Sequence, residues 1–372
     1  MNIRRQTGCF MLLVPALLLF ESCRREEPLP IGKHQGKQTT PVNPSALYPA
    51  SFGAPFLPSD NPFTEEAMYL GRMLFYDPIL SRDSTVSCAS CHRQDKAFAQ
   101  PTKVSAGIFG IQGNRNASAL FNMAWQRALF WDGRHRRMRD LIFEPIQDHR
   151  EMAMNIPLLD AKLKRAPRYK EWFARAYDAE PDVFHMSLAM EQFLLSIVSA
   201  NSKFDRFFPR NLSVFTPQER DGFFFFNETP DDTIRPATGA DCFHCHGGIH
   251  AQTIDPSVGI VNNGLDEVIT DKGLGGITGR SFDIGKFKAP SLRNLSYTAP
   301  YMHDGRFATL EEVIDHYSDG IDFKSPNLSP LINHGNRHLK FTPAQKAALL
   351  AFLRTMDDST LVKDPRYSNP FR

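Results

Sequence analysis

Apolar residues recur at helical spacing in several stretches of this chain. Thr64 precedes the first stretch and is followed by Glu65 and Glu66, which is typical of a capped helix N-terminus. The apolar face of this helix consists of Leu70, Met73 and Leu74. A second helical region spans residues 157–200. Its clearest apolar stripe is Met186, Ala189, Met190, Phe193, Leu194, Ile197 and Val198.

Capping boxes predict the start of three later helices, at Thr216–Glu219, Thr309–Glu312 and Thr342–Gln345. The helix that starts at Thr309 should end near Gly320. The last helix has Leu349, Leu350, Leu353 and Met356 on one face. Residues 247–285 contain many glycines and few periodic apolar positions, so we expect loops there. Strand patterns are few, and the chain is therefore predicted to be mainly α-helical.

The pentapeptide Cys-x-x-Cys-His occurs twice, as Cys88–His92 and Cys242–His246. It is the attachment signature of c-type haem, in which two thiols bind the porphyrin and the adjacent histidine ligates the iron. The predicted attachment and ligand residues are Cys88, Cys91, His92, Cys242, Cys245 and His246. Zinc cages and thioredoxin-like redox pairs also use Cys-x-x-Cys. A four-thiolate zinc cage would leave both trailing histidines unexplained, and no βαβ pattern surrounds either motif.

The chain has 372 residues, enough for two domains, and we expect each domain to form around one haem. The predicted domains are residues 61–208 and 209–372, with the last helix packing back on the first domain. The net charge of +2 gives no reason to expect nucleic acid as a partner.

The first 23 residues are typical of an export signal. An apolar run from Phe10 to Phe20 follows basic residues and is too short to span a bilayer comfortably. Cys23 lies where a lipoprotein would be processed and lipidated, and ordinary cleavage is the alternative. We therefore expect a protein outside the cytoplasm, in the periplasm, attached to the membrane only through a lipid on Cys23. Residues 24–60 are rich in Pro, Gly and Lys and are predicted to be a flexible tether.

Tyr317 is the candidate for a further ligand of the second haem iron. It continues the apolar stripe of Leu310, Val313 and Ile314, which places it on the inward face of the helix. His316 is rotated by about 100° toward the helix edge. The alternative is that Tyr317 packs in the core and ligates nothing.

Several short motifs together resemble those of the bacterial di-haem cytochrome c peroxidase and MauG family. They are Leu70–Asp77, Ser87–His92, Phe130–Arg134, Glu151–Met152, Phe287–Asn294 and Thr298–Gly305. The resemblance implies two cytochrome c-like helical domains with long loops. It also implies that the first haem reacts with hydrogen peroxide and that the second supplies it with electrons from a small cytochrome or similar redox protein.

The resemblance also assigns roles to individual residues. Trp131 matches a tryptophan that lies between the haems, and Glu151 matches the acidic residue above the peroxidatic haem, where a carboxyl group can transfer protons. His303 matches a histidine close to the second haem. The positions that match a calcium site are Asn116, Thr298 and Pro300. From local composition alone, Trp131 is equally a core residue, Glu151 a surface residue, and the calcium positions a polar turn.

The chain differs from many of these peroxidases at three positions. Ile108 replaces a releasable histidine ligand, which predicts a first haem open to peroxide. Leu141 replaces a glutamine near the peroxide site. Tyr317 replaces a methionine ligand of the second haem, as in the MauG branch. We predict a peroxidase; the alternatives are a MauG-like enzyme that oxidises residues of a partner protein, and a non-enzymatic electron carrier.

Overall fold

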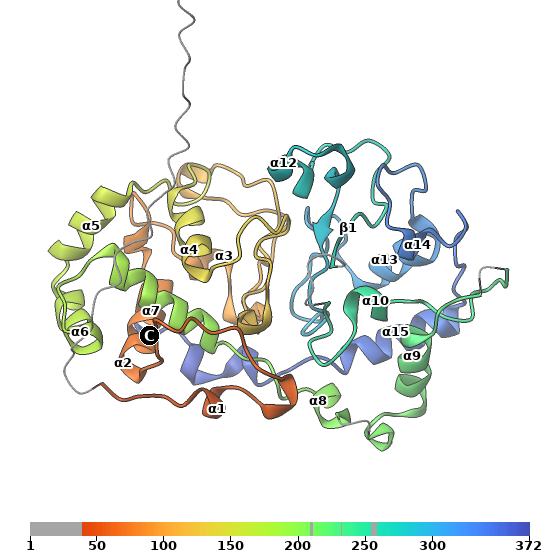
Figure 1. The fold of residues 1–372 in the computed structure, drawn as a ribbon, viewed down its shortest axis with the longest axis horizontal. Helices are drawn as coiled ribbons and strands as arrows, with labels where there is room; N and C mark the ends of the chain where they lie inside the picture. The colour runs from red at the N-terminus through yellow and green to blue at the C-terminus, as the bar shows by residue number, and fades with distance from the viewer. Residues whose placement is uncertain (1–38, 209–210, 232, 254–258) are drawn as a thin grey trace, which may run out of the picture. The chain divides into compact units, whose positions relative to one another are not determined.

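The computed structural model describes most of the chain (Figure 1). The described ranges are residues 39–208, 211–231, 233–253 and 259–372. The predicted signal peptide, the predicted lipidation site Cys23 and residues 24–38 of the predicted tether lie outside these ranges.

Helices make up most of the regular structure, as predicted. The α-helices are α1 (Pro44–Leu47), α2 (Glu65–Tyr76), α3 (Cys88–Cys91), α4 (Met138–Gln147), α5 (Ile156–Arg165), α6 (Pro167–Tyr177), α7 (Val183–Ser196), α8 (Lys203–Phe207), α9 (Pro217–Asn227), α10 (Phe243–His246), α12 (Leu274–Thr278), α13 (Leu310–Asp315), α14 (Pro330–Asn333) and α15 (Pro343–Arg354). Two short strands, β1 (Ile260–Val261) and β2 (Phe287–Lys288), pair antiparallel and form the one sheet of the described residues. No helix in the described ranges is long and apolar enough to cross a membrane.

The predicted helix starts are confirmed. The Thr64 side chain accepts a hydrogen bond from the Ala67 N–H at 3.2 Å, at the N-terminus of α2. Reciprocal capping boxes begin at Thr216, Thr309 and Thr342. Each box satisfies backbone N–H groups that a helix start leaves without a partner.

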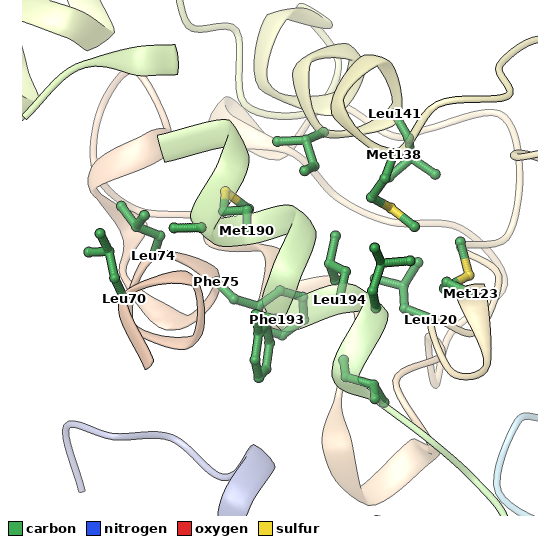
Figure 2. Packing of buried hydrophobic residues seen from close by; sticks show 14 of the residues in the cluster. Leu70, Leu74, Phe75, Leu120, Met123, Met138, Leu141, Met190, Phe193 and Leu194 are labelled. Carbon is green, nitrogen blue, oxygen red and sulfur yellow. The ribbon is translucent and has the colours of Figure 1, made fainter. Parts of the chain in front are cut away.

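The first hydrophobic core forms where α7 packs between α2 and α4 (Figure 2). Every residue of α7 from Met186 to Ser196 is buried, so this helix is covered on all sides and not on one stripe alone. Val198 lies beyond the helix end and is only partly buried. The labelled core residues in Figure 2 are Leu70, Leu74, Phe75, Leu120, Met123, Met138, Leu141, Met190, Phe193 and Leu194.

A second core forms where α9 packs on α15 (Figure 1). Its buried residues begin with Phe204 and end with Met356. Two separate cores in one chain fit the expectation of one domain around each haem motif. The boundary between residues 208 and 209 stays a prediction.

The two helix pairs share one packing detail, a glycine where the helices touch. A Cβ atom on Gly71 of α2 would lie 2.0 Å from the Ala189 carbonyl oxygen and 2.8 Å from the Phe193 Cβ. A Cβ atom on Gly222 of α9 would meet Ala348 and Phe352 at the same two distances. Both helix pairs therefore approach so closely that only glycine fits.

The segment after α15 returns to the first core, which corrects our expectation for the last helix. Helix α15 itself packs on α9 in the second core. Leu361 and Tyr367, beyond its end, are buried in the first core. The return takes place in irregular chain and short 3₁₀ turns, which carry no helical periodicity to read in the sequence.

The described part of the predicted tether, residues 39–60, is also packed and not free. Tyr48 and Phe52 are buried, and both rings contact the Trp125 ring at centroid distances of 5.2 Å. Two aromatic anchors on short turns are enough to hold this segment, although its composition suggested a linker.

Replacing Gly71 or Gly222 by alanine should destabilise the haem-loaded protein. The added Cβ atom meets main-chain atoms that cannot move aside, so each free energy of unfolding should fall by about 1–3 kcal/mol. Gly276→Ala in α12 is the control, because the nearest atom to the added Cβ would be the Lys272 Cβ at 3.6 Å. Denaturant unfolding measures the three variants. A Gly71→Ala or Gly222→Ala protein as stable as Gly276→Ala would contradict the close packing.

Candidate active site

The first Cys-x-x-Cys-His motif forms the short helix α3, and His92 caps its C-terminus. The Nδ1 atom of His92 lies 3.0 Å from the Phe98 carbonyl oxygen. A carbonyl can only accept, so Nδ1 carries the proton and the Nε2 lone pair remains available for a metal. Burial lowers the pKa of His92 to about 4, so the ring is neutral at pH 7.

The second motif repeats this arrangement with a different acceptor. The Nδ1 atom of His246 lies 2.9 Å from the Pro290 carbonyl oxygen, and burial lowers the pKa of this histidine to about 4. All four motif cysteines are free thiols and partly buried. Each motif thus has two thiols and a neutral, oriented imidazole within one short turn. These groups fit a covalently attached haem with a histidine ligand.

Glu151 lies close to the first motif. Burial raises the pKa of Cys88 to about 12, and the negative charge of Glu151 adds to the increase at both Cys88 and Cys91. Burial also raises the pKa of Glu151 itself, with a smaller contribution from Asp148. A partly buried carboxyl group with a raised pKa takes up a proton more readily than an exposed glutamate, which suits a group that transfers protons.

Ile108 supports the Glu151 turn and cannot act as a ligand. Its side chain is buried, with 1% of its surface exposed, and its N–H donates to the Glu151 carbonyl at 2.8 Å. The preceding Gly107 packs so closely that a Cβ atom there would lie 1.9 Å from the Arg150 carbonyl oxygen. Leu141, the other departure near this site, is buried in the first core. The loop is therefore fixed against the chain that carries Glu151.

Tyr317 lies close to the second motif. Burial raises the pKa of Tyr317 to about 12, and the charges of Cys245 and Cys242 contribute to the increase. The Asn263 side-chain amide donates to the Tyr317 hydroxyl at 3.3 Å. The phenol is thus oriented by an amide and lies within electrostatic range of both thiols.

The helix that carries Tyr317 changes form at its end, which corrects the predicted position of His316. Residues His316–Gly320 form a π-helical turn after α13 and end at Gly320, as expected. His316 is buried, and its Nε2 atom lies 3.0 Å from the Asn263 carbonyl oxygen. His316 therefore lies inward and not at the helix edge, and the centroid of its ring is 5.1 Å from that of the Tyr317 ring.

His303 is buried beside the same site. Its ring stacks on Phe287 at a centroid distance of 3.8 Å and an angle of 13°. Burial lowers the pKa of His303, which keeps the ring neutral. His303 and Asn263 line one cavity of about 120 Å³. The structure therefore brings His303 into the surroundings of Tyr317.

Trp131 joins residues from both halves of the sequence. Its indole Nε1 donates to the Asn116 carbonyl at 2.8 Å, and its own carbonyl accepts from the Lys288 N–H at 2.7 Å. The Asn116 N–H in turn donates to the His303 carbonyl at 2.8 Å. A continuous set of contacts thus leads from Trp131 to His303.

The three predicted calcium positions differ in burial and are not all joined by hydrogen bonds. Asn116 is buried, while Thr298 and Pro300 are partly buried. Within the described residues, hydrogen bonds join Asn116 to neither of the other two. The described ranges hold no group of three or more His, Cys, Asp or Glu suited to a metal ion. A calcium site here would rest on amide and carbonyl oxygens.

Sequence reasoning missed several residues that shape both sites. Asn263 and the carbonyls of Phe98 and Pro290 were not expected, because a backbone acceptor leaves no signal in residue type. Arg115 was also missed. Its guanidinium group binds Asp132 at 2.6 Å and Asp271 at 2.7 Å, joining the loop after Trp131 to the second half of the sequence. Asp132, which belongs to the Phe130–Arg134 motif, was the one sequence signal that could have pointed to this ion pair.

Comparisons with known proteins point to one family. A model of the family described as di-haem cytochrome c peroxidase matches residues 65–212. The methylamine utilization protein MauG of Methylorubrum extorquens is 32% identical over 314 residues, which cover 80% of this chain and 80% of that protein. The cytochrome-c peroxidase IdrP2 of Denitromonas iodatirespirans is 29% identical over 332 residues, covering 82% of this chain and 85% of that protein.

Solved structures agree with these relatives. The crystal structure of a MauG-like protein associated with microbial copper homeostasis has a TM-score of 0.78 and 33% identity, covering 87% of this chain and 99% of that chain. The diheme peroxidase BthA from Burkholderia thailandensis has a TM-score of 0.65 at 22% identity, covers 90% of this chain and 96% of its own, and supports the fold alone. The predicted fold of two cytochrome c-like domains is confirmed. The chain belongs to the di-haem cytochrome c peroxidase and MauG family, whose members are oxidoreductases with two haems.

Proposed function

We propose that this protein reduces hydrogen peroxide to water at a first haem bound by Cys88–His92. Electrons would enter through a second haem bound by Cys242–His246, from a cytochrome c or a similar redox protein. The observation that carries the proposal is the difference between two otherwise similar motifs. Glu151 accompanies the first motif and Tyr317 the second. A carboxyl group suits proton transfer to peroxide, whereas a phenol suits a closed metal site.

Each turnover requires two electrons and two protons for one peroxide, which becomes two waters. The haems supply the iron and the redox chemistry. The two protons come from solvent, and Glu151 would take a proton from the near oxygen of peroxide and deliver it to the far one. Its raised pKa makes both directions of transfer accessible. Ile108, at the position where many of these peroxidases have a releasable histidine ligand, is buried and has no group that could bind iron.

The remaining residues orient ligands and connect the two sites. The Nδ1–H bonds of His92 and His246 strengthen each imidazole as a donor to iron. Tyr317 would be the second protein ligand of the C-terminal iron, with its oxygen oriented by Asn263. Trp131 offers an oxidisable indole between the halves of the molecule, hydrogen-bonded to Asn116.

A MauG-like oxidation of residues on a partner protein is the second candidate function. Tyr317 favours it, because this position holds methionine in many of the peroxidases that the chain resembles. The identity of 32% to MauG of Methylorubrum extorquens also supports it. A partner protein that gains a peroxide-dependent covalent change, detected by mass spectrometry, would distinguish it from simple peroxide reduction.

Three further assignments belong to the same proposal. Covalent attachment through both cysteine pairs fits the spacing of the motifs. Calcium would be held by Asn116, Thr298 and Pro300; the Asn116 Oδ1 atom accepts no hydrogen bond within the described residues, which supports a role as a metal ligand. Export to the periplasm, with a lipid on Cys23, follows from the sequence of residues 1–23.

The haem-loaded protein should oxidise a reduced donor in the presence of hydrogen peroxide. Steady-state absorbance of a reduced small cytochrome measures this directly, without prior reduction of the enzyme, because Ile108 cannot block the first iron. Protein with both haems bound that oxidises no donor upon peroxide addition would refute the peroxidase proposal.

Replacing Glu151 by glutamine should lower kcat/KM for peroxide by about 100-fold or more, because the proton carrier is lost. In the wild-type protein, kcat/KM should fall as the pH drops through a pKa above the ordinary glutamate value of 4.5, since the carboxylate must be free to accept a proton. This acid limb should be absent in Glu151→Gln. Glu171→Gln is the control, because Glu171 is exposed on α6. Equal rates and pH profiles in both variants would exclude the role of Glu151.

Replacing Tyr317 by phenylalanine should change the electron paramagnetic resonance signal of one ferric haem and leave the other unchanged. The reason is that Tyr317 is assigned to the second iron alone. Tyr301→Phe is the matched control, because the Tyr301 hydroxyl donates to the Leu295 carbonyl at 2.8 Å and is not assigned to iron. Two unchanged signals in Tyr317→Phe count against ligation by Tyr317.

A further inference from the structure

The last part of the chain forms a strap from the second core to the first. We define the C-terminal strap as residues 358–367, which follow α15 and contain two short 3₁₀ turns. Leu361 and Tyr367 are buried in the first core, where most of the other members come from residues 48–198. A segment so far away in sequence therefore completes the packing beneath the first motif.

The strap contacts the loop that holds His92. The Phe98 carbonyl accepts the His92 Nδ1 bond, and the Phe98 ring packs edge-on against Tyr367 at a centroid distance of 6.2 Å. Phe98 is fully buried and has a φ of +59°, a strained value that close packing and the bond from its N–H to the Arg93 carbonyl at 2.8 Å maintain. Tyr367 is thus one of the groups that keep this carbonyl pointed at the imidazole.

A second contact fixes the same loop. The Gln94 side-chain amide donates to two strap carbonyls, to Leu361 at 3.2 Å and to Asp364 at 2.7 Å. Gln94 lies two residues after His92 and Phe98 six, so the strap contacts the loop that follows the histidine at two points.

Tyr367 itself is held firmly from three directions. Its hydroxyl donates to the Ser196 carbonyl at 2.7 Å, and its carbonyl accepts from the Tyr76 hydroxyl at 2.7 Å. Arg72 of α2 donates to the neighbouring Arg366 carbonyl at 2.7 Å. These bonds attach the Tyr367 ring to the end of α7 and the main chain of Tyr367 and Arg366 to α2.

The other end of the strap is tied to the second site. The Asp358 N–H donates to the Asn294 side chain at 2.8 Å. Asn294 belongs to the same segment as Pro290, whose carbonyl accepts the His246 Nδ1 bond. The Asp358 carboxylate also accepts the N–H groups of Ala200 and Asn201, each at 3.0 Å. One short segment therefore links the chain around both histidine acceptors.

We propose that the C-terminal strap positions the Phe98 carbonyl and so controls the strength of the His92 Nδ1 hydrogen bond, with Tyr367 and Gln94 as positioning residues. The inference rests on the proposed function only in taking His92 as an iron ligand. A stronger bond at Nδ1 makes the imidazole a stronger donor to iron, and a loosened strap makes it a weaker one.

The test is the iron–histidine stretching band of the ferrous haem-loaded protein, measured by resonance Raman spectroscopy. Tyr367→Leu and Gln94→Leu should each shift this band of the first haem to lower frequency and leave the bands of the second haem in place. Lys363→Ala should shift neither, because the Lys363 side chain lies on the strap but is exposed. An unchanged band in both folded variants overturns the proposal.

Tyr367→Leu removes a buried ring, and a protein that fails to fold would give no result. A milder variant therefore tests the same contact. Tyr367→Phe keeps the ring and removes the two hydroxyl bonds, one donated to the Ser196 carbonyl and one accepted from the Val198 N–H. It should give a smaller shift in the same direction, and no shift in both Tyr367→Phe and Gln94→Leu counts against the strap. The band reports ligation and not turnover. A shifted band in a protein without peroxidase activity would therefore keep this inference and reject only the proposed function.

Discussion

Both haem motifs depend on the hydrogen bond from a histidine Nδ1 to a main-chain carbonyl. This bond fixes the tautomer, so the other ring nitrogen is available to a metal, and it fixes the plane of the ring. The two acceptors, Phe98 and Pro290, lie in different loops, yet the distances are 3.0 and 2.9 Å. The rest of each domain holds its loop at that distance. In the first domain this requires the C-terminal strap as well as the helices around the motif.

The two sites share this proximal geometry and differ in the residues that accompany them. A carboxyl group with a raised pKa lies near one pair of thiols, and a phenol oriented by an amide lies near the other. Equivalent helix pairs, each with a glycine at the contact, support both sites. In the proposed function, this repeated scaffold holds one reactive and one closed metal centre, which differ through the residues around them.

Sequence patterns predicted the helices well where a cap and an apolar face coincide. Thr64, Thr216, Thr309 and Thr342 begin helices because capping satisfies local N–H groups, which is visible in a few residues. The returning strap and the packed segment at Tyr48 and Phe52 were not predictable, because distant aromatic contacts hold them and no local period marks them.

The candidate site was predictable only where neighbouring residues in the sequence carry the signal. The prediction of haem attachment came from adjacent residues, whereas Glu151 and Trp131 were assigned by family resemblance, since local composition could not separate them from ordinary positions. The carbonyl acceptors, Asn263 and Arg115 act through tertiary contacts that one sequence does not contain. His316 was misplaced because the α-helical period was extended into a turn that is π-helical.

That π turn makes the second site depend on the number of residues in the segment as well as on their identity. In an α-helix, neighbouring side chains diverge by about 100°, so adjacent rings are both buried only where the helix is covered on more than one face, as at Phe225 and Phe226 of α9. The five residues His316–Gly320 accommodate an imidazole and a phenol side by side. Deletion of one codon would restore the tighter spiral and rotate every later side chain of the turn by about 100° around the helix axis, even if every remaining amino acid were kept.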